Sequence, residues 1–163
     1  MTTRRVSLLL GLLYLIASMS VVAAPKSKPL LEGTVSGVEL CPQSLCTNGA
    51  LFTGTFTGKV SGKHTSGPIL VQVTHGPLNT NVGGETVVTG GSWIIRTSRG
   101  EFMGRIEGGG KLIANDDETF DVILQLQMTQ PTSATLTFTG LLDHSGLDEF
   151  PPTIPTFIGT ISP

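Results

Sequence analysis

Beyond about residue 30, apolar and polar residues alternate along the chain with a period of two. The clearest run is 119–128 (TFDVILQLQM), in which every second residue is apolar. Because successive side chains of a β-strand point to opposite faces, this alternation indicates strands with one buried face. The period expected of an amphipathic helix is nearly absent from the same part of the chain. The pattern therefore predicts an all-β fold.

The same alternation predicts strands at several other places. The stronger candidates are 51–60, 69–75, 92–97, 119–128 and 134–143, and the weaker ones are 31–40, 85–90, 101–108 and 156–161. Short intervals rich in Gly, Pro, Asn and Asp separate most of them, which is typical of hairpins in an antiparallel sheet. The proline-rich end, 150–163, is predicted to be an edge strand or a strap, because proline cannot donate to a ladder.

A large residue, a glycine and a second large residue recur on one face of three predicted strands. The copies are Phe52-x-Gly54-x-Phe56, Phe102-x-Gly104-x-Ile106 and Phe138-x-Gly140-x-Leu142. Inward glycines let a strand bend sharply, and a neighbouring aromatic ring can cover the exposed backbone. The glycines could also keep an interior cavity open. The motif predicts a single antiparallel β-barrel of about 8 strands with glycine-punctuated hairpins, and a two-sheet β-sandwich is the alternative.

The amino terminus has the composition of a secretory signal peptide. Two arginines precede an uncharged apolar run, and small residues then fit a cut after Ala23, with Ala24 as the alternative. We therefore expect residues 1–23 to be removed, which leaves one all-β domain at 24–163 in a secreted or periplasmic protein. An uncleaved N-terminal membrane anchor is the alternative, although the apolar run is near the shortest length that spans a bilayer.

Charge and glycine patterning argue against several classes of partner. The chain has 10 Lys and Arg against 12 Asp and Glu and no basic stripe, so nucleic-acid binding is not expected. No later apolar segment is long enough to cross a membrane as a helix, so we expect no membrane association after signal cleavage. The glycine-rich stretches at 54–58 and 104–111 match no phosphate-binding fingerprint, and no nucleotide or other cofactor is expected.

The two cysteines of the mature chain, Cys41 and Cys46, enclose the short stretch CPQSLC. Export would place them in an oxidising compartment, where disulfides persist. Their spacing differs from the redox motif C-x-x-C, and two sulfurs fall short of the four ligands of structural zinc. The stretch predicts a small disulfide loop and no metal site.

Three residues are candidates for ligand binding. His75 ends an apolar row, where it would lie at the mouth of a barrel or bond a loop carbonyl. His144 follows another strand, within a run 143–145 whose residue types are those of a nucleophilic triad, although consecutive residues cannot converge as a triad requires. Arg96 interrupts an otherwise apolar strand, and its alternative role is an exposed charge on the outer face.

Acidic residues gather at 116–118, where a hairpin turn is expected. Carboxylates are ligands that calcium prefers, but the EF-hand spacing is absent. The cluster therefore predicts a solvated turn.

These observations predict a non-enzymatic binding or interaction module, whose partner is a small apolar ligand or another protein. In architecture, the glycine-punctuated hairpins resemble allene-oxide-cyclase and dirigent-type barrels. That resemblance implies an enzyme that shapes a reactive intermediate in an apolar cavity, and it carries over no site residues. A purely structural surface domain is the third hypothesis. A core filled by phenylalanines would exclude both ligand and cyclase, whereas a cavity with convergent polar groups would favour them.

Overall fold

The computed structural model describes residues 31–41, 47–48, 51–63, 65–146 and 154–163. These residues form β-strands and no helix. The strands are β1 (Gly33–Cys41), β2 (Thr47–Asn48), β3 (Leu51–Ser61), β4 (Ser66–His75), β5 (Glu85–Thr97), β6 (Gly100–Ile106), β7 (Gly110–Ala114), β8 (Thr119–Gln130), β9 (Ala134–Asp143) and β10 (Thr156–Ser162). Within the described ranges, no helix is available that could cross a membrane.

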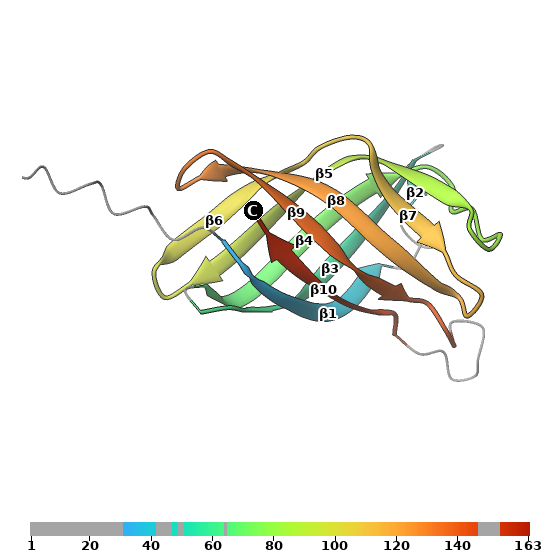
Figure 1. Cartoon of the computed structure of the whole chain (residues 1–163), viewed down its shortest axis with the longest axis horizontal. Helices are drawn as coiled ribbons and strands as arrows, with labels where there is room; N and C mark the ends of the chain where they lie inside the picture. The colour runs from blue at the N-terminus through green and yellow to red at the C-terminus, as the bar shows by residue number, and fades with distance from the viewer. Residues whose placement is uncertain (1–30, 42–46, 49–50, 64, 147–153) are drawn as a thin grey trace, which may run out of the picture.

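The strands form a closed antiparallel barrel with eight strand positions around its wall (Figure 1). Neighbours in the barrel are mostly neighbours in the sequence, and β1 closes the barrel by pairing with both β3 and β10. Figure 1 shows this closure where the blue β1 lies beside the red β10. The extra strand β2 pairs with the start of β3. The predicted barrel is therefore confirmed, and the two-sheet sandwich is wrong.

One of the eight positions is occupied by two consecutive strands, β6 and β7, which both lie between β5 and β8. The residues between them stay tied to the wall: the Glu107 amide donates to the Gln125 carbonyl, and the Gly109 amide donates to the Val88 carbonyl, both at 2.9 Å. Gly109 has φ of 94°, which favours glycine. The sequence predicted only a turn at 108–111. It could not show that the residues between β6 and β7 form a bulge within one strand position of the barrel.

The carboxyl-terminal strand β10 is not an edge strand, and that prediction is wrong. It pairs along its length with both β9 and β1. The described prolines Pro155 and Pro163 flank the strand, so they take no donor position in its ladders. Pro155 instead accepts a hydrogen bond from the Glu39 amide at 2.9 Å.

Aromatic rings cover glycines on the inner face of the barrel. A methyl group at Gly140 or Gly159 would lie 2.8 or 2.6 Å from the ring of Phe138, and one at Gly37 would lie 2.6 Å from the ring of Phe157. The rings therefore occupy the space that a larger residue would need. Ring shielding is thus confirmed for Gly140 of the recurring motif, whereas at Gly104 the nearest atoms belong to the backbone of β8.

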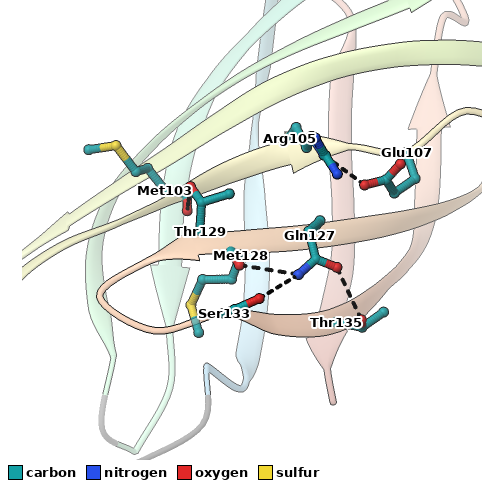
Figure 2. A network of polar contacts seen from close by, with 8 residues as sticks. All are labelled: Met103, Arg105, Glu107, Gln127, Met128, Thr129, Ser133 and Thr135. Atoms are coloured by element: carbon teal, nitrogen blue, oxygen red, sulfur yellow. Dashed lines mark hydrogen bonds and ion pairs between the residues drawn. The ribbon is translucent and has the colours of Figure 1, made fainter.

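The outer face of the barrel is largely polar. Figure 2 shows part of it on β6, β8 and β9, where Gln127 donates to Ser133 at 3.0 Å and accepts from Thr135 at 3.2 Å. Arg105 pairs with Glu107 nearby, at 2.8 Å between Nε and Oε1. These contacts are local and exposed, so they place this side of the wall in solvent.

The acidic run 116–118 lies in the turn between β7 and β8, as predicted. The Asp117 carboxylate accepts from the Thr119 hydroxyl at 2.6 Å and from the Thr119 amide at 3.3 Å. The hydroxyl bond is the main reason that the pKa of the exposed Asp117 carboxyl is lowered from its ordinary value. The described residues contain no group of three His, Cys, Asp or Glu placed to hold a metal ion.

Candidate functional site

The barrel interior contains a cavity that is partly open to solvent. The volume of the cavity is about 60 Å³, and it is about 820 Å³ when the adjoining open solvent is included. Because the larger volume includes open solvent, the smaller volume limits the size of a ligand that the cavity can enclose. One water molecule needs roughly 10–15 Å³, so the cavity has room for several heavy atoms.

Most side chains that line the cavity are apolar, and the ionisable ones among them are Glu39, His75 and His144. Phenylalanines line the space instead of filling it: Phe56 meets Phe157 edge to face, with ring centroids 5.5 Å apart. The interior is thus neither a fully packed core nor a wide pore.

The polar side chains gather at one end of the barrel, which we call the histidine end. It is the end at which β1, β4 and β9 finish and β3, β8 and β10 begin. Glu39 lies near the end of β1, His75 ends β4, and His144 directly follows β9. Antiparallel pairing brings these three strand ends together, although they are far apart in the sequence.

Glu39 and His144 form a buried pair. His144 Nε2 lies 3.0 Å from Glu39 Oε2, so the imidazole donates to the carboxylate. Glu39 is 5% exposed and His144 is 8% exposed. The Phe120 ring packs edge-on against the His144 ring at 5.4 Å, and the His144 amide donates to the Glu118 carbonyl at 3.2 Å. Both partners are therefore held in position, and the pair can donate or accept a hydrogen bond, or move a proton, at the cavity wall.

His75 is also buried and lines the cavity. Its Nδ1 lies 2.6 Å from the Gly76 carbonyl, which can only accept, so Nδ1 carries the proton of this bond. Its ring stacks on Phe52 with centroids 5.9 Å apart. In the neutral imidazole, Nε2 is left as an acceptor. The residue therefore fills both roles that the sequence suggested, at the cavity and at a loop carbonyl.

Trp93 on β5 lines the cavity as well, and it is 3% exposed. Its Nε1 is buried and has no hydrogen-bond partner among the described residues. Ladder pairing places it in one lateral row with Glu39, through Phe56 on β3 and Val71 on β4. The indole and the Glu39–His144 pair are thus parts of one wall.

The structure places two of the three predicted ligand-binding residues, His75 and His144, at the cavity. Arg96 lies on the outer face instead, with its side chain 68% exposed and paired with Glu101 at 2.8 Å. Its neighbour Ile95 is buried on the inner face, and Arg96 has the opposite parity, so its charge remains in solvent. Arg96 and the cavity residues therefore do not form one site.

Sequence reasoning missed Glu39 and Trp93. For Glu39 a signal was present, because it has the same parity as Val35 and Gly37 in β1 and so falls on the inward face. A charged residue on a predicted buried face is informative, because such groups are rarely buried without a partner. Trp93 fell within the predicted strand 92–97, but the sequence could not show that its donor is unpaired.

The predicted disulfide lies partly outside the described residues. The backbone of Cys41 ends β1, while Cys46 is among the residues that the structure does not describe. The disulfide therefore stays a prediction.

No protein-family model, curated protein or solved structure matches this chain. Statements about function therefore depend on the chemistry of the cavity.

Proposed function

We propose that the protein binds one small, mostly apolar molecule in the barrel cavity. The observation that carries this proposal is an apolar hollow whose ionisable side chains, Glu39, His75 and His144, converge at the histidine end. Ligand sites commonly combine apolar walls with a few placed polar groups. The apolar part of the ligand contacts the wall, and its outer polar group bonds to Glu39, His144 or His75.

The size of the cavity restricts the ligand further. The cavity volume of about 60 Å³ is less than the roughly 150 Å³ that accommodates benzene in an engineered cavity. A thin chain, or the narrow end of a larger molecule, fits this space better than a ring system. The remainder of the ligand lies toward the solvent.

An enzyme acting on such a ligand is the second candidate. The Glu39–His144 pair favours it, because a carboxylate and an imidazole in contact can transfer a proton at the wall of an apolar cavity. Incubation of the protein with its extracted ligand, followed by NMR analysis of the recovered compound, distinguishes the two: a binding protein returns the ligand unchanged, whereas an enzyme returns a different compound, which can be an isomer.

Filling the cavity should abolish binding. Val71 points inward and lines the cavity, so Val71→Phe is expected to weaken binding of 1-heptanol at least tenfold, because its ring occupies the ligand's space. Leu70→Phe is the matched control, since Leu70 lies on the outer face of the same strand and should bind 1-heptanol like the wild type. Saturable shifts in ¹H–¹⁵N NMR spectra provide the measurement. Equal binding by the wild type and Val71→Phe would place the ligand elsewhere and contradict the proposal.

We also propose that the protein is exported, cut after Ala23, and closed by a Cys41–Cys46 disulfide. The composition of residues 1–23 supports export, and export supports the disulfide. Protein isolated from its source is expected to begin at Ala24 and to be two hydrogens lighter than the reduced chain. Intact-mass measurement checks both points. An uncut chain would indicate a membrane anchor, and two alkylatable thiols under oxidising conditions would refute the disulfide.

A further inference from the structure

We infer that the ligand carries a hydrogen-bond acceptor on its inner part, a carbonyl or ether oxygen, and that the Trp93 indole donates to it. This inference rests on the proposed function, because it concerns the chemistry of the molecule in the same cavity. It assigns Trp93 as the residue that selects oxygen-containing compounds over hydrocarbons.

The main observation is the unpaired donor itself. The indole N–H can donate but not accept, and Trp93 Nε1 is buried without a partner in the described structure. More than about 90% of buried polar groups in proteins are paired, and leaving one unpaired is unfavourable. A phenylalanine would supply an aromatic wall without this penalty. A donor in the wall of a binding cavity is instead matched by an acceptor that arrives with the ligand.

Among the residues that the structure describes, no acceptor bonds to the Trp93 indole. The ladder partners of Trp93 are Val71 on β4 and Gly104 on β6, and neither has a polar side chain. Glu39, the nearest buried carboxylate in the same lateral row, lies three strand spacings away, which is about 14 Å along the wall. It is also already bonded to His144. Since Trp93 lines the cavity, we assign the missing acceptor to the ligand.

The position of the polar groups indicates the class of ligand. The molecule has an acceptor oxygen against Trp93 and reaches toward Glu39 and His144 with a second polar group or with its solvated end. An anionic ligand is disfavoured, because its charge would lie in an apolar cavity that already contains the Glu39 carboxyl. Neutral aliphatic ketones, esters and ethers fit this description.

The test compares 2-heptanone with 2-methyl-1-heptene, which replaces the carbonyl oxygen by a methylene group. Affinities for wild type and Trp93→Phe are measured by NMR titration. The ratio of ketone to alkene affinity is expected to fall about tenfold in Trp93→Phe, which corresponds to one net hydrogen bond. The ratio in Leu70→Phe, altered on the outer face, should equal that of the wild type.

A second measurement uses the wild type alone, so it does not depend on the folding of Trp93→Phe. The chain has one tryptophan, so one indole N–H resonance reports on this site. The ketone is expected to shift that proton downfield, and the alkene to shift it less. An equal shift with both compounds, or an unchanged affinity ratio in Trp93→Phe, would overturn the inference while leaving the cavity as a binding site. Failure of both compounds to bind the wild type would overturn the proposed function as well.

Discussion

Replacing His144 with leucine is expected to lower the free energy of unfolding by about 3 kcal/mol. The substitution removes the partner of Glu39, whose carboxylate is buried and, within the described structure, accepts its side-chain hydrogen bond from His144. A buried charge without its partner loses both its hydrogen bond and its solvation. Urea unfolding followed by Trp93 fluorescence measures the change, because Trp93 is buried in the folded barrel.

Two further variants test whether the loss of stability in His144→Leu depends on the burial of the ion pair. Arg96→Gln breaks an exposed pair and is expected to cost no more than about 1 kcal/mol. The double variant Glu39→Met with His144→Leu should recover most of the lost stability, because apolar residues can replace a buried pair at little cost. A loss in His144→Leu as small as that in Arg96→Gln would contradict the buried pair.

The second large effect is expected at Gly104, where Gly104→Ala should lower the free energy of unfolding by about 3 kcal/mol. A methyl group there would lie 2.0 Å from the Gln127 carbonyl oxygen and 2.9 Å from the Met128 Cα. Both obstacles are backbone atoms of β8, so the strands must separate before the methyl group fits. Chemical unfolding compared with the wild type measures the loss.

Two other glycines provide graded controls for this prediction. Gly54→Ala meets mainly the tip of the Phe56 ring, at 2.7 Å, and a ring can rotate away, so the cost should be smaller. Gly76→Ala meets nothing within 4 Å and should change stability by less than about 0.5 kcal/mol. Equal costs at Gly104 and Gly76 would mean that close strand approach does not determine where the barrel needs glycine.

The double variant at Glu39 and His144 also bears on function. If it is as stable as the wild type yet no longer binds the ligand, then the pair contributes to recognition and not to folding. Buried ion pairs are weak evidence for stability, because desolvation opposes the attraction between the charges. The placement of this pair at the wall of an apolar cavity is consistent with a role in binding.

Much of the fold could be predicted from local pattern. Period-two alternation identified the main strands, and the recurring glycines indicated a curved wall in preference to a flat one. The errors concern where a strand ends and which strands pair, since both depend on contacts between residues far apart in the sequence. Residues 85–90 and 92–97 were predicted as two strands, but they form the single strand β5, because Gly90 and Gly91 pair with β4 and continue the ladder.

The sequence by itself determined which residues face inward, because alternation depends only on the geometry of an extended chain. It could also place His75 and His144 at strand ends. Only the tertiary structure decided that Glu39 meets His144, 105 residues later, because that contact requires β10 to close the barrel between β1 and β9. The hollow and the unpaired Trp93 donor were likewise decided in three dimensions, since they depend on how rings from different strands share one interior.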